Sequence, residues 1–586
     1  MTDGLAVILD DALAGTLTRL PGGRLRFDYD DEYRDTRGAT PLSVSMPTTV
    51  RSHPDRDISP WLWGLLPDNQ AVLQRWARDF HASASSPFSL LATPIGHDCA
   101  GAVRFSAPDH LDEIIESPGG VIWLTDEQVA QRLRDLREDT TAWLGREFTG
   151  QFSLAGAQAK TALLLEDGRW GVPSGSAATS HIVKPAVAGL DDHDLNEHLC
   201  LDAAGRAGLV VARTRVARFG DESAIVVDRY DRRRVGDRLL RVHQEDVAQA
   251  LGVHPAHKYQ NEGGPGPREV ARLLRDVMPP RVADEAVWRF FDALAWNWLI
   301  AGTDAHAKNY SLLLAGGDVR LAPLYDVASA LPYGIHERKL RFAMKIGGDY
   351  RVYPFHNTWK AAAQELGVDP DVALDRVVAL AERAPDAFAE SAASSEVAAL
   401  SRPLPGRLLD LVCRRVERCE AILRSPSAKV IAVSGSYEEG LGEIVDAVSP
   451  QSLAPDGGPP LIRDAADALR AAVVADPRNS AAVRERVVEL AAGALRVIRA
   501  IGDVEPPPGF ASPTQDRLPA MIDDYAPNTA NLFMPDDDRV ARFAHEMIRT
   551  AERYANADPR SIYGSTPERL SALFRIVGLA ARGIAI

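Results

Sequence analysis

Cysteine is scarce in this chain of 586 residues, and its histidines follow no metal-binding pattern. The four cysteines, Cys99, Cys200, Cys413 and Cys419, have no C-x-x-C spacing and are too few to cross-link a chain of this length. We therefore expect free thiols and a reducing compartment, the cytoplasm. The fourteen histidines nowhere form H-E-x-x-H or a similar spacing, which argues against a zinc enzyme.

The chain also has fewer basic than acidic residues and has no long apolar runs. Lysine and arginine total 66 against 81 aspartates and glutamates, so the formal net charge is −15 at pH 7. Nucleic-acid-binding proteins usually present a basic face, so we expect no direct contact with DNA. No run approaches the ~18 apolar residues of a membrane span, and the acidic N-terminus lacks the basic start of a secretory signal. We expect no membrane partner.

What is present is the composition of an ordinary globular protein, 46% hydrophobic and 25% charged. The chain is too long for one core, and its length suggests roughly three or four domains. Residues 1–107 have the pattern of a small α+β subdomain, with strands predicted at Leu5–Leu9, Arg24–Tyr29 and Leu42–Met46. The apolar segment Trp61–Asn69 predicts a buried helix end followed by a turn.

Residues 108–425 form a second predicted region, strand-rich up to about residue 230 and helical afterwards. Helices are expected over Thr125–Leu144 and about Leu195–Ala207. The expected strands are Phe152–Ala155, Thr161–Glu166, Trp170–Val172, His181–Lys184 and Ala224–Asp228. A small sheet lobe followed by a helical lobe is the layout of a protein kinase. The predicted fold class is therefore α+β, two-lobed and protein-kinase-like, with an N-terminal α+β subdomain.

Residues 426–586 are predicted to be a mainly helical C-terminal extension. Two Pro/Gly-rich stretches, Ser449–Pro460 and Glu505–Pro513, separate expected helices at Leu461–Val474 and Ala481–Ile501. The segment Lys429–Tyr437 resembles the start of a strand-to-phosphate loop but lacks the Gly-Lys-Ser/Thr ending of a P-loop, which favours a structural role. The pattern predicts no function for the extension.

Residues 304–326 form the most informative pattern in the chain. Two apolar six-residue runs, Tyr310–Ala315 and Val319–Leu324, flank Gly-Gly-Asp and predict a hairpin that returns Asp326 to the end of the sheet that Asn309 leaves. Asp304 precedes Asn309 by the spacing that protein kinases use between the catalytic base and a magnesium-binding Asn, and Asp326 follows where the second magnesium carboxylate is expected. Such oxygen ligands suit Mg²⁺. Because Asp and Asn are common in turns, a plain loop remains the alternative.

Two segments upstream have the pattern of a phosphate-binding site. Ser153–Lys160 lies between apolar strands, and its small residues would let backbone N–H groups approach a polyphosphate while Lys160 adds charge; a plain β-turn is the alternative. Lys184 closes an apolar strand where a kinase places its phosphate-contacting lysine, and Glu197 on the next helix is a candidate partner. A lysine at a sheet edge and a solvated acid are the alternatives.

The segment Ile225–Asp231 leaves a buried strand and turns polar, as a hinge between two lobes does. Tyr230 would supply part of an apolar face for adenine. The helix predicted over Val287–Ile300 places aromatic and apolar residues at helical spacing, which predicts a core that holds the following loop rigid.

Taken in order, these segments resemble the HipA-type serine/threonine kinase toxins of type II toxin–antitoxin systems. In the second region the resemblance lies in Phe152–Leu163, His181–Lys184, Val227–Arg232, His243–Asp246, Lys258–Pro265, Asn297–Asn309 and Pro323–Ser329. In the first it lies in Gly15–Tyr29, Leu42–Pro47, Gly64–Asp68 and Asp98–Phe105. The resemblance covers about residues 5–425, and the order of so many motifs makes it specific. The sequence departs from the family pattern at Ala159, where an acidic residue is common, and at Ala305, where glycine is frequent, and neither departure removes a ligand.

The resemblance implies a role for each matching residue. Asp304 would be the catalytic base, and Asn309 and Asp326 would hold Mg²⁺. ATP would contact the phosphate loop Ala155, Gly156, Ala157, Gln158, Ala159 and Lys160, together with Lys184, Asp228, Arg229, Tyr230, His306, Ala307, Lys308, Asn309, Tyr325 and Asp326. Ser153 matches the serine whose autophosphorylation ejects the phosphate loop and silences such kinases.

The implied activity is an ATP- and Mg²⁺-dependent protein kinase acting as a toxin. Its substrate would be a translation component such as an aminoacyl-tRNA synthetase, and a helix-turn-helix antitoxin would supply the contact with DNA. Two alternatives stay open. One is a non-toxic regulatory kinase of the same type, whose target the C-terminal extension recruits. The other is a catalytically inert scaffold that binds the antitoxin as a co-repressor, although Lys184, Asp304, Asn309 and Asp326 are all retained.

Overall fold

The computed structural model describes residues 4–424, apart from 10, 117–118, 147–148, 188, 237, 336 and 352–355, together with residues 458–475, 480–504, 547–552, 554–555 and 572–580. The chain divides into two compact units, Met1–Ser425 and Pro426–Ile586. The segment Lys429–Tyr437 lies outside the described residues. Within the described part, no helix has the length and apolar character needed to cross a membrane.

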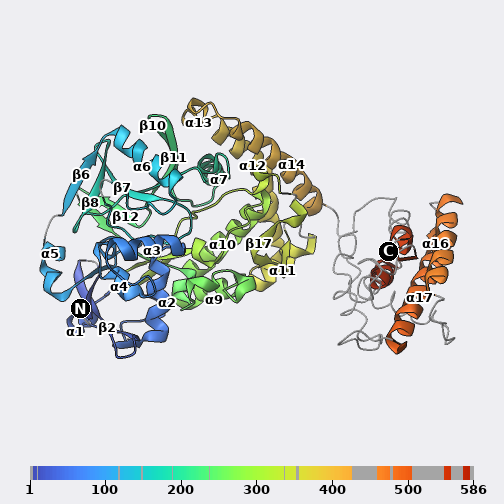
Figure 1. Ribbon diagram of the computed structural model, residues 1–586, viewed down its shortest axis with the longest axis horizontal. Helices are drawn as coiled ribbons and strands as arrows, with labels where there is room; N and C mark the ends of the chain where they lie inside the picture. The colour runs from blue at the N-terminus through green and yellow to red at the C-terminus, as the bar shows by residue number, and fades with distance from the viewer. Residues whose placement is uncertain are drawn as a thin grey trace. The chain divides into compact units, whose positions relative to one another are not determined.

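The N-terminal part of the first unit is a five-stranded antiparallel sheet partly covered by short helices (Figure 1). The strand order is β4-β3-β2-β1-β5, from β1 (Gly4–Leu9), β2 (Ala12–Arg19), β3 (Leu25–Tyr29), β4 (Ser52–Pro54) and β5 (Arg104–Ser106). The helices are α1 (Asp31–Asp35), α2 (Asp55–Leu65), α3 (Gln70–Asp79), α4 (Pro87–Leu91), η1 (Pro94–His97), η2 (Pro108–His110) and α5 (Leu111–Glu116).

A six-stranded antiparallel sheet follows, in the order β10-β11-β9-β7-β8-β6. Its strands are β6 (Gly120–Leu124), β7 (Thr161–Glu166), β8 (Arg169–Ser174), β9 (His181–Pro185), β10 (Thr214–Phe219) and β11 (Glu222–Asp228). Helices α6 (Asp126–Glu138) and α7 (His193–Arg206) both contact β9, β10 and β11. Thr125 and Gln128 cap the start of α6 reciprocally, which fixes where that helix begins.

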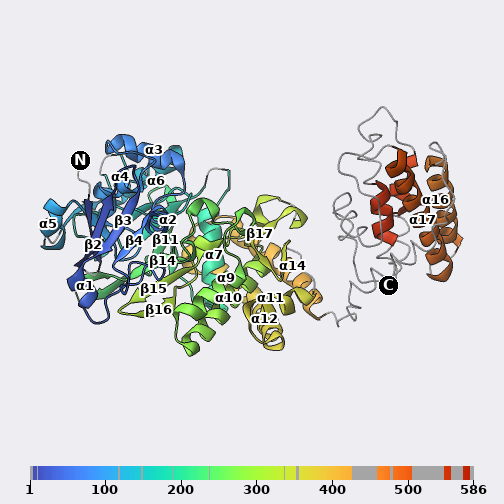
Figure 2. The same ribbon diagram turned by 90° about the horizontal axis from the view of Figure 1, so that it is seen from below.

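The rest of the first unit is mainly helical, and Figure 2 shows these helices gathered beside the two sheets. The helices are α8 (Val247–Ala250), η3 (Pro255–His257), η4 (Gln260–Glu262), α9 (Pro267–Val277), α10 (Pro280–Ile300), η5 (Ala307–Asn309), η6 (Leu331–Tyr333), η7 (Glu337–Lys339), α11 (His356–Leu366), α12 (Pro370–Ala392), α13 (Ser395–Ala399) and α14 (Leu404–Arg424). Three small sheets lie among them: β12 (Arg232–Val235) with β13 (Arg238–Arg241), β14 (His243–Asp246) with β15 (Ser311–Ala315) and β16 (Asp318–Leu321), and β17 (Arg341–Ile346) with β18 (Asp349–Arg351).

Two hydrophobic cores organise the first unit. One is shared by the five-stranded sheet and the six-stranded sheet, so the boundary expected at residue 107 does not separate two cores. The other lies among the helices and includes Trp296 and Trp298 of α10, both fully buried. The helix predicted over Val287–Ile300 is therefore present within α10, which leads through Ala301 into residues 304–309.

In the second unit, the described residues form helices with a core of their own. These are α16 (Gly458–Ala475) and α17 (Ser480–Val504), which pack against residues 547–552, 554–555 and 572–580. The helices predicted at Leu461–Val474 and Ala481–Ile501 are thus confirmed, each slightly longer than expected.

Three local predictions were wrong. Leu42–Met46 is a tight turn closed by a single Ser43–Met46 bridge, and Phe152–Ala155 is an irregular segment in which only Ser153 forms a bridge, to Cys99. The helix expected to reach Leu144 ends at Glu138. In the two short segments, contacts with distant residues replace regular strand pairing. The helix instead stops at Asp139, whose side chain accepts from the N–H and the hydroxyl of Thr141.

Candidate active site

Lys184, at the end of β9, makes two ion pairs where the six-stranded sheet meets the helices. Its Nζ lies 2.7 Å from Glu197 Oε1 on α7 and 2.7 Å from Asp326 Oδ1, which follows β16. Burial alone would lower the pKa of Lys184, but the carboxylates of Asp326 and Glu197 outweigh it and raise that pKa. The pairing of Lys184 with Glu197, which the sequence left open, is formed in the structure.

Asp326 sits in a strained backbone conformation at this junction. Its φ is +57°, in the left-handed region that non-glycine residues seldom adopt. Burial alone would raise the pKa of its carboxyl, but Lys184, with help from Lys160, holds that pKa well below its usual range. The side chain is therefore a carboxylate, with 38% of its surface exposed.

Residues 304–309 follow α10, which ends with Ala301 at φ +54°. Asn309 Nδ2 donates a hydrogen bond of 2.8 Å to the Asp304 carbonyl, which closes the loop on itself. The Asp304 side chain is exposed, and its Oδ1 accepts 2.8 Å from the hydroxyl of Tyr259. Burial lowers the pKa of His306, and the Nδ1 atom of that ring has no hydrogen-bond partner among the described residues.

The predicted hairpin brings the two ends of this loop region together. β15 and β16 pair from Leu312–Leu321 to Ala315–Asp318, so the turn is Gly316-Gly317, with φ of +58° and +91°. That geometry is the two-residue hairpin that favours glycine. The Tyr325 hydroxyl then donates to the Lys308 carbonyl at 2.6 Å, which places the residue before Asp326 against the loop that ends in Asn309.

The small-residue segment after Ser153 is held against the N-terminal strands and helices. Ser153 is fully buried, and its hydroxyl donates 2.8 Å to the carbonyl of Leu65. Lys160 Nζ folds back to donate 2.7 Å to the Ala155 carbonyl. Gly156 has a φ of +105°, a backbone conformation that residues with a Cβ rarely adopt. Burial, and then the charge of Lys184, lower the pKa of Lys160 to about 8.

An apolar patch lies at the predicted hinge. Ala212, Ile225 and Val227 form it, with Ile182, Tyr230 and Tyr325 packed against them. The rings of Tyr230 and Tyr325 lie 5.5 Å apart. Asp228 accepts from His181 Nε2 at 3.2 Å and is half exposed.

Arg229 differs from its hinge neighbours. Its guanidinium is buried in an ionic cluster with Asp98 and Asp231, together with Arg232 and Arg241. This side chain joins the six-stranded sheet to the N-terminal part of the chain, and its donors bind Asp231, Asp98, Thr179 and the Cys99 carbonyl.

The structure thus brings Lys184, Glu197, Asp326 and the 304–309 loop to one junction, with residues 155–160 adjoining through Lys160. Among the described residues no group of three or more His, Cys, Asp or Glu side chains has metal-site geometry. The donor set that remains is Asp326 with the side-chain oxygen of Asn309. One carboxylate and one amide suit Mg²⁺, which takes few protein ligands and completes its shell with phosphates and water.

Two residues at this junction were missed as site residues. Asp68 binds both Lys258 and Lys308, and Tyr259 binds Asp304. Both stand in segments that carry the family resemblance, Gly64–Asp68 and Lys258–Pro265, which was the one signal that pointed to them.

Two protein-family profiles match the chain. The HipA N-terminal domain matches residues 5–106, and the HipA-like C-terminal domain matches residues 152–388. A protein of Sinorhizobium fredii named "Putative kinase Y4mE" is 33% identical over 390 residues, which span 66% of this chain and 91% of the relative. The chain belongs to the HipA family.

Other members agree with this placement. The serine/threonine-protein kinase toxin HipA of Shewanella oneidensis is 30% identical over 365 residues, 60% of this chain and 80% of that protein. A solved structure of Shewanella oneidensis HipA in complex with HipB and operator DNA has the same fold, with a TM-score of 0.61 and 24% identity over 72% of this chain and 98% of that one. The family is therefore one of kinases by the names of its members, and residues 426–586 of this HipA-family chain lie beyond both profiles.

Proposed function

We propose that this HipA-family chain is an ATP- and Mg²⁺-dependent serine/threonine protein kinase, and the toxin of a toxin–antitoxin pair. The observation that supports it best is the buried Lys184, bonded at 2.7 Å to both Glu197 and Asp326 beside the 304–309 loop. Active protein kinases use a strand lysine paired with a helix glutamate, next to a metal-binding aspartate. The six-stranded sheet with α7 then serves as the first lobe, and the helices from α8 onward serve as the second.

Each part of the site has a role in phosphoryl transfer. Asp304, exposed and held by Tyr259, orients the substrate hydroxyl and accepts its proton. Lys184 and Lys160 contact the phosphates of ATP, and the backbone of residues 155–160 cradles them. Asn309 and Asp326 hold Mg²⁺, which when bound neutralises charge on the phosphates.

Adenine is proposed to lie on the apolar patch of Ile225 and Val227, with Tyr230 and Tyr325 at its edge. Asp228 is placed to meet the ribose. Because the Arg229 side chain is bound within the buried ionic cluster, we drop it from the nucleotide contacts. Residues 306–308 line the phosphate side of the same site.

A helix-turn-helix antitoxin is the proposed partner. The Shewanella oneidensis HipA structure contains HipB and operator DNA. With a net charge of −15, this chain would reach DNA through the antitoxin rather than through its own surface. The proposed substrate is a protein of the translation apparatus, such as an aminoacyl-tRNA synthetase, and Ser153 is the proposed site of self-inactivation.

The test is transfer of label from [γ-³²P]ATP with Mg²⁺ to proteins of a bacterial lysate, with phosphorylated products identified by mass spectrometry. We expect label on one protein of the translation apparatus and on the chain itself. Phosphate transfer without growth arrest when the protein is expressed would support a regulatory kinase instead. The absence of transfer to any protein would favour the catalytically inert scaffold.

A further inference from the structure

Asp68, in the turn between α2 and α3, lies at the meeting point of three segments of the candidate site. Its Oδ1 accepts 2.5 Å from Lys308 Nζ, and its Oδ2 accepts 2.8 Å from Lys258 Nζ. Its backbone N–H donates 3.0 Å to the Gly156 carbonyl. One residue of the N-terminal sheet region therefore touches the 304–309 loop, the segment before Tyr259 and the phosphate loop.

The side chains of Asp68, Lys258 and Lys308 form an ion-pair cluster that is largely buried. Their exposed fractions are 11% for Asp68, 3% for Lys308 and 14% for Lys258. Burial alone would raise the pKa of the Asp68 carboxyl, but Lys308 and then Lys258 hold that pKa below its usual value. Removal of a carboxylate shared between two largely buried ammonium groups costs more than removal of one from a surface pair, because it leaves both cations without compensation.

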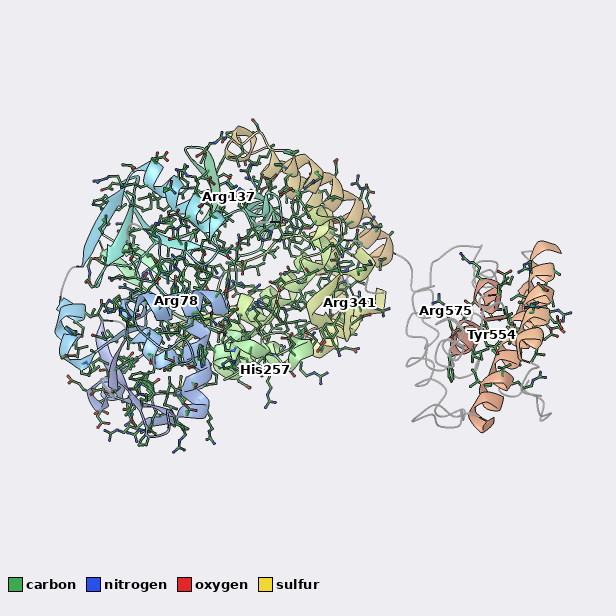
Figure 3. The ribbon with its side chains drawn as sticks, in the orientation of Figure 1. Arg78, Arg137, His257, Arg341, Tyr554 and Arg575 are labelled. Carbon is green, nitrogen blue, oxygen red and sulfur yellow. The ribbon has the colours of Figure 1, made fainter. Side chains whose placement is uncertain are left out.

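Both lysines belong to segments that contact Asp304. Lys308 belongs to the same short loop, which Asn309 closes onto the Asp304 carbonyl. Lys258 immediately precedes Tyr259, whose hydroxyl binds the Asp304 side chain at 2.8 Å. Figure 3 labels His257, which lies at the surface beside Lys258, so this segment runs from the protein surface into the site.

We propose that Asp68 is a positioning residue for phosphoryl transfer, which fixes Asp304 through Lys308 and through the Lys258–Tyr259 segment. Asp68 itself touches no reacting atom. The inference rests on the proposed kinase function and extends it, because the N-terminal sheet region then completes the active site in addition to any role in binding a partner.

The first test is steady-state kinetics of full-length Asp68→Asn with Mg-ATP and a phosphorylatable protein. The amide keeps the backbone bond to Gly156 but removes the charge that holds the lysines. Displacement of a reacting group by about 1 Å costs on the order of 100-fold, so we expect kcat to fall ~10- to 100-fold. The KM for ATP should change by less than about 3-fold, because Lys184, Asp326 and residues 155–160 keep their contacts and Lys308 alone among the proposed nucleotide contacts loses its partner.

Two variants separate positioning from loss of stability. Asp79→Asn makes the same charge change at a half-exposed site on α3. Tyr29→Phe removes the hydroxyl that binds the Met46 carbonyl and the Leu42 N–H, which destabilises the same region away from the lysines. We expect kcat to be unchanged in both. All ten tryptophans lie before residue 425, so fluorescence-detected urea unfolding ranks the stability of the variants.

A second variant and a second readout cover the case in which Asp68→Asn does not fold. Lys258→Met leaves the Asp68–Lys308 pair intact and should lower kcat by roughly 3- to 10-fold through Tyr259. Amide hydrogen exchange needs no activity, and residues 304–309 should exchange at least about 10-fold faster in Asp68→Asn or Lys258→Met than in Asp79→Asn.

The outcomes are distinguishable. A wild-type chain that transfers no phosphate refutes the proposed function. Unchanged exchange at residues 304–309, an unchanged kcat, or a kcat that falls in Tyr29→Phe in proportion to its stability overturns the positioning role of Asp68.

Discussion

Ser153 should be phosphorylated slowly in wild type, and faster when the segment around it is loosened. In the structure Ser153 is fully buried between Phe152, also fully buried, and Leu154, 5% exposed. Its backbone N–H donates to the Asp98 carbonyl at 3.0 Å, its carbonyl accepts from Ala100 N–H at 3.2 Å, and its hydroxyl donates to Leu65. No phosphoryl donor reaches this hydroxyl unless the segment leaves its position.

The free energy needed to release the segment around Ser153 can be estimated from these contacts. Three hydrogen bonds at ~1 kcal/mol each and two apolar side chains at ~2 kcal/mol each give about 7 kcal/mol. With ~1.4 kcal/mol per factor of ten, roughly one molecule in 10⁵ has Ser153 released. Kinases turn over at ~1–100 s⁻¹, so the modification rate should be ~10⁻⁵ to 10⁻³ s⁻¹, a half-time between about ten minutes and most of a day.

Phe152→Ala removes about 2 kcal/mol of the burial that holds the segment and should speed the modification by roughly 10- to 100-fold. The assay is intact-protein mass spectrometry over time with Mg-ATP, with the phosphate located on peptides. Phe219→Ala is the matched control, because Phe219 lies in β10 and packs in the same hydrophobic core. Modification should leave a protein with weakened ATP binding, since a phosphate of −1.5 to −2 charges competes with those of ATP.

Complete modification of wild type within a minute would mean that the segment is not held as the structure has it. Equal rates in Phe152→Ala and wild type would refute the link between burial and release. A phosphate found only at other residues would reject Ser153 as the switch and leave the kinase proposal standing.

Three further outcomes are expected. Asp326→Ala should abolish Mg²⁺-dependent ATP binding in calorimetry, because it removes the proposed metal carboxylate; unchanged affinity with Mg²⁺ would assign the metal to another residue. A chain ending at residue 429 should keep autophosphorylation, since both family profiles end before that point, and an aggregated or inactive product would show that the extension is needed. Burial raises the pKa of Glu245 from 4.5 to about 8, so its stabilising contribution is complete below pH 4.5 and is lost as pH rises through 8. From pH 6 to pH 8, the free energy of unfolding should fall by about 2 kcal/mol more in wild type than in Glu245→Gln, and equal slopes would contradict this.

The elements around the candidate site were predictable because their signals are local. The apolar run of β9, the helical spacing in α10 and the glycine turn of the β15–β16 hairpin each lie within a few residues of chain. A hairpin with fixed register also fixes where its flanking segments meet, so the return of the chain before Asp326 to the loop that ends in Asn309 followed from the pattern, and the hydrogen bond from Tyr325 to Lys308 joins the two segments.

The two strand predictions failed where distant groups replace local hydrogen bonds. Leu42–Met46 alternates like a strand, but the Tyr29 hydroxyl binds its first and last residues, and the Glu245 carboxyl group, 201 residues away, accepts from the Val44 N–H. Asp68 was not predicted as a site residue, because its lysine partners lie 190 and 240 residues later in the chain. The helical or strand periodicity of a sequence does not indicate which residues pair across such separations.

The proposed role of Asp304 as the base of a protein kinase can be tested directly. Phosphate transfer from labelled ATP is measured for purified wild type, Asp304→Asn and the control Asp318→Asn, which changes an exposed carboxylate at the start of β16. We expect ATP binding in all three proteins, wild-type transfer in Asp318→Asn, and a loss of transfer of ~10²-fold or more in Asp304→Asn. Near wild-type transfer by Asp304→Asn would contradict it.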